Sequence, residues 1–221
     1  MNSVIVTKFY DEPMLCEKEI LRYAGCVKPD SKVIDVLESC VDEIGPKLSY
    51  KVCYRELPVV VDGSCCDFGA FEVRSKNLAD NLKGCSSVIV FAATIGVDID
   101  RLIAKYGRIE PSKALMMQAV GTERIETLCD TFCSDISQEK GIKKMGRFSP
   151  GYGDLPIETQ REIFAVLECP KRIGLTLNDS MIMSPSKSVT AFVGIAEDGK
   201  ERKSEKCGNC GKTDCIFRGV V

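Results

Sequence analysis

The segment from Arg147 to Pro156, which reads RFSPGYGDLP, contains several residue types that can hold a small charged ligand. Its two prolines and two glycines favour a loop of fixed shape. Arg147 offers a planar guanidinium to a carboxylate or phosphate, Gly151 allows a ligand to approach the backbone closely, and Tyr152 presents a ring face and a hydroxyl. The segment suits a small anion that carries a flat group, although composition alone favours the commoner explanation, a structural turn with a surface arginine.

A second pattern that could do chemistry lies near the end of the sequence, where the spacing C-x2-C-x4-C places thiols at Cys207, Cys210 and Cys215. Glycines lie between them, so the thiolates could converge on one zinc ion or on an iron–sulfur cluster. Structural zinc usually has four ligands, so the fourth would come from Cys65 or Cys66, from a partner chain or from a bound molecule. The alternative is a metal-free tail of reduced thiols.

Glu126 is a third candidate, because it lies at the edge of an apolar helical stripe, with Thr122 four residues before it and Cys129 three residues after it. A carboxylate in such a place usually extends to water. It could instead face a cationic group of a ligand, and the sequence alone leaves both interpretations open.

The composition excludes several classes of protein. The 221 residues contain 13 cysteines and no histidine, which rules out a Ser-His-Asp triad, a Cys-His protease, His-ligated zinc and histidine ligation of haem or cobalt. The net charge is -2, so there is no basic excess for nucleic-acid binding. No apolar run approaches the roughly 18 residues of a membrane span, and neither a P-loop nor a G-x-G-x-x-G motif after a strand is present. So many thiols are typical of a reducing compartment, and we expect a cytoplasmic protein with no nucleic-acid or membrane partner.

The elements that must position these residues follow one another without a regular repeat. The pattern predicts a helical region at 17–45 with Ser31 as a helix cap, a long helix from Pro111 to Gln138, and another helix that opens at Pro156. The remaining elements are short, with strands at 48–57, 59–61, 68–73, 87–92, 173–177, 181–183 and 189–195 and helices at 76–82 and after Gly96. This order lacks a βαβ alternation, so it favours an α+β fold with a largely antiparallel sheet and flanking helices.

The composition also divides the chain into three regions. Residues 1–196 contain the expected helices and strands and would form the ligand-binding domain. Residues 197–206 include eight charged side chains, four of each sign, which is typical of a solvated linker. Residues 207–221 would be a short cysteine-rich, metal-binding tail.

Three motifs in the chain resemble the activation domain of cobalamin-dependent methionine synthase. That family carries an R-x-x-x-G-Y loop, and this chain has Arg147, Gly151 and Tyr152 at those places. The stretch IGLTLNDS at 173–180, which leads into SPSKSV, is similar to the family's G-x-x-L-T-x-S strand and P-x-x-S-V turn. A weaker match, ATIG at 93–96, is seen in free-standing bacterial members.

The resemblance implies a twisted antiparallel fold that binds S-adenosylmethionine. Such a domain supports reductive methylation of cob(II)alamin, here in a separate methionine synthase that lacks its own activation domain. By position, Arg147 would bind the methionyl carboxylate, while the backbone at Ser149 and Gly151 would contact the ligand. Tyr152 would pack on the ligand, and Glu126 would meet its ammonium or sulfonium. A flavodoxin or ferredoxin-type protein would donate the electron, and the chain would be a component of methionine synthase activity rather than a complete enzyme.

Two other interpretations depend on the cysteine tail. One is an iron–sulfur or zinc protein that reduces or reactivates another corrinoid methyltransferase. The other is a zinc-stabilised interaction module. The aromatic pair that the fused family members carry after the final hairpin has no counterpart here, because the charged linker and the cysteine tail stand in its place. The resemblance therefore leaves the adenosine side of the pocket unassigned.

Overall fold

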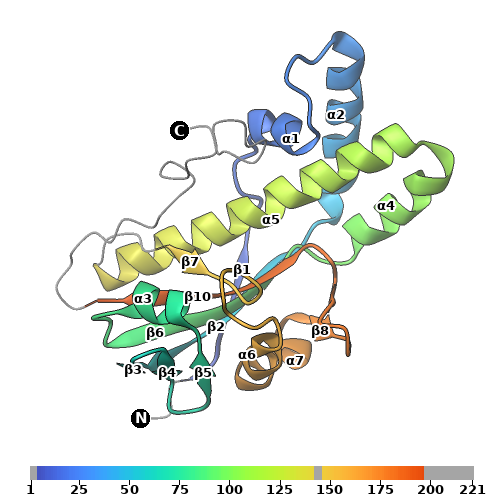
Figure 1. Cartoon of the computed structure of the whole chain (residues 1–221). Coiled ribbons are helices and arrows are strands. Elements are labelled where there is room, and N and C mark those ends of the chain that lie inside the picture. The colour runs from blue at the N-terminus through green and yellow to red at the C-terminus, as the bar shows by residue number, and fades with distance from the viewer. Residues whose placement is uncertain (1–3, 142–145, 197–221) are drawn as a thin grey trace.

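A five-stranded antiparallel sheet forms the centre of the fold (Figure 1). The computed structural model describes residues 4–141 and 146–196. All neighbouring strands of the sheet are antiparallel, which confirms the predicted α+β class. In spatial order the strands are β1 (Val6–Tyr10), β2 (Tyr50–Pro58), β6 (Ser87–Thr94), β10 (Ser188–Ile195) and β7 (Arg147–Phe148).

Helices cover the two faces of this sheet. The 30-residue helix α5 (Pro111–Lys140) runs across one face (Figure 1), and the helices that pack on it are α1 (Glu17–Tyr23), α2 (Ser31–Ile44) and α4 (Asp98–Ile109). The other face is covered by α3 (Lys76–Leu82), α6 (Thr159–Leu167), α7 (Cys169–Ile173) and a small sheet of β3 (Val60–Asp62), β4 (Cys65–Asp67) and β5 (Glu72–Arg74). Two connections complete the order, the 3-10 helix η1 (Gly45–Lys47) before β2 and the hairpin of β8 (Thr176–Leu177) and β9 (Met183–Ser184) before β10.

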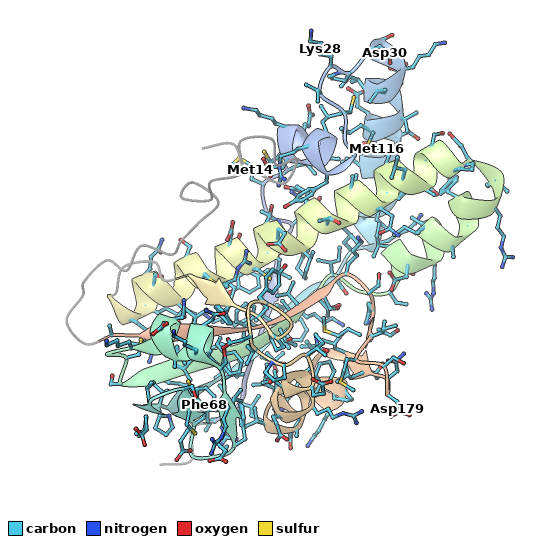
Figure 2. All side chains as sticks on the ribbon, in the orientation of Figure 1. Met14, Lys28, Asp30, Phe68, Met116 and Asp179 are labelled. Atoms are coloured by element: carbon cyan, nitrogen blue, oxygen red, sulfur yellow. The ribbon has the colours of Figure 1, made fainter. Side chains whose placement is uncertain are left out.

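The central strand β6 is buried on both faces, as its continuous apolar sequence predicts. Phe91 belongs to the core on the α5 side, whereas its neighbour Val90 belongs to the core on the α6 side. Figure 2 shows one member of each core, Met116 on α5 below α1 and α2, and Phe68 in the opposite layer. Neighbouring side chains of a strand point to opposite faces, so one apolar run serves two cores.

The predicted helical region 17–45 consists of two helices rather than one. Gly25 follows α1 with a φ of 71°, a left-handed conformation that stops the helix. The cap of α2 is Asp30 rather than Ser31, because Asp30 is extended and its side chain accepts a hydrogen bond of 3.0 Å from the Val33 amide. Ser31 is instead the first residue of the helix.

Several other predicted boundaries are wrong by a few residues, among them the strands expected at 68–73 and 181–183, which the structure places at 72–74 and 183–184. Helix α6 begins at Thr159 rather than at Pro156, because the Thr159 amide donates to the Pro156 carbonyl in a turn that precedes the helix. The strand expected at 173–177 is reduced to β8, because Ile173 is the last residue of α7 and Gly174 follows it in a left-handed conformation. The edge strand β1 was not predicted, since its sequence VTKFY mixes apolar and polar residues and leaves no side chain fully buried.

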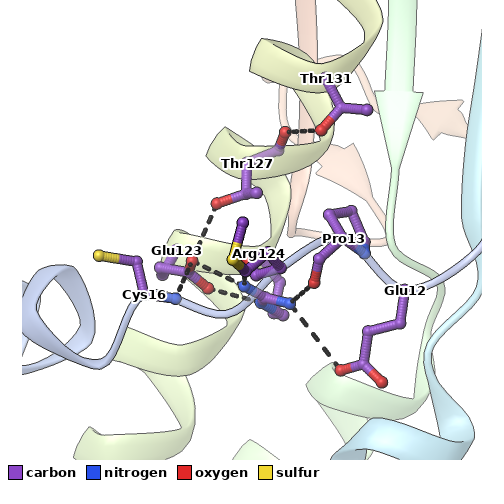
Figure 3. Close-up of polar contacts among 8 residues, drawn as sticks. Glu12, Pro13, Cys16, Glu123, Arg124, Thr127 and Thr131 are labelled. Atoms are coloured by element: carbon purple, nitrogen blue, oxygen red, sulfur yellow. Dashed lines mark hydrogen bonds and ion pairs between the residues drawn. The ribbon is translucent and has the colours of Figure 1, made fainter.

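A buried ion pair on α5 fastens the N-terminal segment to the long helix (Figure 3). Glu123 is 2% exposed and Arg124 is 1% exposed. Arg124 holds the carboxylate through Nε at 2.5 Å and Nη2 at 2.7 Å. The other hydrogen-bond partners of the pair, all at 2.6 to 3.0 Å, are the carbonyls of Pro13 and Met14, the amide of Cys16 and the hydroxyl of Thr127. Oε1 of Glu12 lies farther away, 3.8 Å from Nη1 of Arg124. Protein groups satisfy both charges, which is typical of a structural rather than a ligand-binding pair.

Candidate functional site

The candidate loop begins at an edge of the main sheet. Strand β7 pairs with β10 only through Arg147 and Phe148. Strand β10 extends beyond this pairing to Ser188, and along that stretch it is paired with β6 on its other side. Among the described residues, no strand covers the free edge of β10 at Ser188–Thr190. A ligand can therefore lie beside this part of the sheet.

Backbone hydrogen bonds within the loop fix its shape, as its glycines and prolines predict. The Tyr152 amide donates to the Ser149 carbonyl at 3.2 Å, and the Gly151 amide donates to the Leu155 carbonyl at 2.9 Å. Gly151 has a φ of 87°, and a Cβ atom there would lie only 3.1 Å from Cδ1 of Ile157. Glycine is therefore required for both the backbone conformation and the space. The side chain of Leu155 is buried in the core on the α6 side, which anchors the end of the loop.

Asp154 ties this loop to the first turn of α3. Its carboxylate accepts hydrogen bonds from the amides of Lys76 and Asn77 at 2.8 and 3.1 Å, two groups that a helix leaves unpaired at its start. It also accepts from the hydroxyl of Ser75, whose oxygen in turn caps α3 by accepting from the Leu78 amide. These donors, the Ser75 hydroxyl foremost, hold the pKa of Asp154 below its usual value. Sequence patterns do not indicate this contact, because the partners are 77 to 79 residues apart.

A cavity of about 420 Å³ lies between the loop, α5, α6 and the free edge of β10. Its walls come from both layers of the fold, because α5 and α6 cover opposite faces of the sheet. This volume suits a metabolite. The residues that bring polar side-chain groups to its wall include Glu126, Arg147, Ser149, Tyr152, Gln160 and Ser188.

Arg147 is held in the cavity wall with one side of its guanidinium unused. Its Nη2 lies 2.8 Å from Oε2 of Glu126 and 3.3 Å from Oδ1 of Asp130. Its Nη1 is buried and has no hydrogen-bond partner among residues 4–141 and 146–196. Burial opposes the charge of Arg147, but the sulfur of Cys129 and the two carboxylates outweigh burial and raise the pKa of the guanidinium. A fixed, permanently charged guanidinium whose Nη1 is unused in the described residues is suited to a carboxylate or phosphate ligand.

Gln160 is a second cavity residue with an unused polar atom. It lies in the first turn of α6 and is 5% exposed. Its Oε1 is buried and finds no hydrogen-bond partner in the described part of the chain. Gln160 is not among the site residues expected from the sequence, although a signal exists. It stands three, four and seven residues before Ile163, Phe164 and Leu167, so it is the polar first member of a buried helical stripe.

The structure brings together most of the residues that were expected to bind a ligand. Arg147, Glu126, Ser149 and Tyr152 all line the cavity. Gly151 is not a lining residue, and it instead shapes the turn between Ser149 and Tyr152. The role of each residue in binding stays a prediction.

The expected metal ligands Cys207, Cys210 and Cys215 lie outside the described residues, so the metal-binding tail also stays a prediction. Within residues 4–141 and 146–196, no group of three or more Cys, Asp or Glu side chains is placed to hold a metal ion. Of the two residues considered for a fourth ligand, Cys66 is fully buried in β4 and Cys65 is half-buried beside it. The same part of the chain has no helix with the length and apolar character that crossing a membrane requires.

The part of the chain that contains the cavity matches a known protein family. The model of the family described as vitamin B12 dependent methionine synthase, activation domain, matches residues 74–214, which include every residue that lines the cavity. The chain belongs to this family. The resemblance inferred from the three sequence motifs is thus confirmed.

Solved structures support the same fold for this activation domain. A crystal structure described as the MetH reactivation domain bound to AdoHcy is similar, with a TM-score of 0.66 and 14% sequence identity. The match covers 90% of this chain and 80% of that chain. Among curated protein sequences, none matches this chain.

Proposed function

We propose that the cavity binds S-adenosylmethionine and that this activation domain serves the reductive methylation of cob(II)alamin held by a separate methionine synthase. The observation that carries the proposal is the buried Nη1 of Arg147, which lacks a partner in the described residues, beside the carboxylate of Glu126. An amino acid needs such a pair, a cation for its carboxylate and an anion for its ammonium. The MetH domain of similar fold was crystallised with AdoHcy, which contains the same amino-acid group.

The described residues divide into those that bind the ligand and those that shape the site. Arg147 would hold the carboxylate of the ligand, and Glu126 would face its ammonium. The backbone at Ser149 and Gly151 would follow the ligand closely, because the turn there has no side chain in the way at Gly151. Tyr152 is 69% exposed and lines the cavity, so its ring would cover the ligand at the open side.

The bound ligand supplies a methyl group on a positively charged sulfur. The contribution of the protein is to hold that ligand in one orientation, a role that needs positioning rather than a covalent intermediate. Because the printed sequence contains no histidine, it cannot carry the D-x-H-x-x-G motif that binds cobalamin in methionine synthase. In this proposal a separate methionine synthase holds the cobalamin and a flavodoxin or ferredoxin-type protein donates the electron, all in the cytoplasm. On this view the chain contacts the methionine synthase only during reactivation. We therefore expect a modest and partly polar interface between the two proteins.

Binding is tested by calorimetric titration of S-adenosylmethionine into the wild-type chain and Arg147→Ala. Loss of a charge-assisted hydrogen bond costs about 1.5–3 kcal/mol, so the dissociation constant should rise about ten- to a hundredfold. Arg101→Ala is the matched control, because Arg101 is a surface residue paired only with the nearby Asp98 among the ion pairs of the described chain. Equal affinities of wild type and Arg147→Ala would remove Arg147 from the site. Absence of binding by the wild type would refute the proposal.

The role in reactivation is tested by absorbance spectroscopy. A methionine synthase in the cob(II)alamin form is mixed with a reduced electron donor and S-adenosylmethionine, with and without this chain. We expect methylcobalamin to form faster when wild type is present, and Arg147→Ala to restore much less of that rate. The same rate without the chain would contradict the role in reactivation, whereas success with a different corrinoid protein only would correct the partner.

A further inference from the structure

The position of Gln160 is unusual for a residue that only packs. Gln160 lies on the buried face of α6 together with Ile163, Phe164 and Leu167, where an apolar side chain would fill the core. Gln160 nevertheless lines the cavity. Its Oε1 is buried and has no hydrogen-bond partner among the described residues. Because a buried acceptor without a partner destabilises a fold, such an atom is suited to a donor that a ligand brings.

The position of Gln160 relative to Arg147 indicates which part of a ligand it meets. Arg147 and Glu126 lie on the side of α5, and they form the only carboxylate-and-cation pair that lines the cavity in the described chain. Gln160 comes from α6, which covers the opposite face of the sheet. A ligand that spans the cavity with its amino-acid group on the first side would present its nucleoside to the second.

We propose that the carboxamide of Gln160 recognises the adenine of the ligand, with Oε1 accepting a hydrogen bond from the exocyclic 6-amino group. This inference rests on the proposed function. A glutamine side chain presents an acceptor and a donor side by side in one plane, which matches the amino group and the neighbouring ring nitrogen of adenine. It is neutral, as the base is, so the contact selects by hydrogen-bond pattern rather than by charge. Gln160 thus acts as a specificity-determining residue.

The experiment compares two ligands that differ in the purine at C6 and in the proton on N1. S-adenosylhomocysteine carries an amino group at C6, and S-inosylhomocysteine carries an oxo group, which would face Oε1 as a second acceptor. Wild type should bind the adenosyl compound about tenfold or more tightly than the inosyl compound. In Gln160→Met, which keeps the length and removes both polar atoms, the affinity for the adenosyl compound should fall to about that for the inosyl compound.

Glu162→Met is the matched control, since Glu162 lies on the exposed face of the same helix, and it should keep the wild-type preference. A second readout separates recognition from packing. Because Gln160→Met removes an unpartnered buried acceptor, its free energy of unfolding without ligand should be equal to or higher than that of the wild type. Lower stability with an unchanged preference for adenosine would show that Gln160 is structural and would overturn the inference.

The remaining outcomes distinguish this inference from the proposed function. If wild type binds both compounds equally, or if Gln160→Met retains the preference, the contact with adenine is refuted while the binding of the amino-acid group stands. Wild type is also compared on the 2′-deoxy and 3′-deoxy analogues of S-adenosylhomocysteine. If wild type binds such an analogue more weakly than the parent compound, and Gln160→Met binds the two equally, the contact belongs to the ribose and the assignment to the base is overturned. If wild type binds neither compound nor S-adenosylmethionine, the proposed function fails, and this inference fails with it.

Discussion

Replacing Arg124 with methionine should destabilise the protein strongly, because it leaves a buried carboxylate without its cation. Glu123 is 2% exposed and would keep only the Cys16 amide and the Thr127 hydroxyl as donors. The carbonyls of Pro13 and Met14 would lose their donor at the same time. Breaking a buried pair on one side costs about 3–5 kcal/mol. Domains of this size have about 5–15 kcal/mol of stability, so this one substitution should remove a large part of it.

The free energy of unfolding in urea measures this effect, with the slope of each transition as a check that the transition stays two-state. Removing both charges in Glu123→Leu/Arg124→Met should recover at least about 1 kcal/mol relative to Arg124→Met, because no buried charge is then left unpaired. The control is Lys171→Ala. Lys171 is 78% exposed and its Nζ lies 3.9 Å from Oε2 of Glu168. Lys171→Ala should therefore lower the free energy of unfolding by less than about 0.5 kcal/mol.

A loss of less than about 1 kcal/mol in Arg124→Met, with an unchanged slope, would refute the view that this pair holds the N-terminal segment on α5. A double variant less stable than Arg124→Met would refute the electrostatic explanation in particular. The backbone contacts to Pro13 and Met14 would then account for the effect.

Two further predictions concern the loop anchor and the adjacent thiols. Hydrogen bonds from Ser75 and the α3 amides lower the pKa of Asp154 in the folded protein. The stability that Asp154 contributes is therefore fully present above its unfolded pKa of about 3.9, and it is lost as the pH falls through the lower pKa of the folded state. The difference in urea stability between wild type and Asp154→Asn should therefore be constant from about pH 5 to 7 and shrink toward zero at lower pH, and a difference that is independent of pH would contradict this anchor. Burial raises the pKa of Cys66 to about 11, whereas Cys65 is half-buried, so iodoacetamide should alkylate Cys65 and spare Cys66 in the native protein. Equal labelling of the two thiols by peptide mass spectrometry would show that β4 is open to solvent.

The sequence predicts elements whose deciding residues lie within the element itself. The long helix was expected from Pro111 to Gln138, and α5 begins at Pro111 and ends two residues later than expected, where Gly141 takes a left-handed conformation. The buried strand at 87–92 was visible as an apolar run. The candidate loop was visible because its prolines and glycines act locally. In each case the signal is a short-range steric or packing preference.

Features that depend on distant contacts could not be predicted in this way. Asp154 lies in the candidate loop, yet its partner α3 lies more than 70 residues earlier. Asp30 and Ser31 are adjacent and equally suited to cap a helix, and only the structure shows that Asp30 is the extended residue. Gln160 carries a local signal, a polar residue in an apolar stripe, but its meaning depends on a cavity that other, distant elements complete.

The cavity lies where the two layers of the fold meet, which explains why its residues come from distant parts of the chain. Glu126 and Asp130 orient the guanidinium of Arg147 before any ligand is bound, and the contact of Asp154 with α3 fixes the loop that begins at Arg147. Groups that are already in place lose little entropy when a ligand arrives, so a few contacts suffice for affinity. A ligand that satisfies both unused atoms, the Nη1 of Arg147 and the Oε1 of Gln160, has to bridge the layers. The two ends of the site should therefore contribute separately, Arg147 to affinity for the amino-acid group and Gln160 to selection of the base.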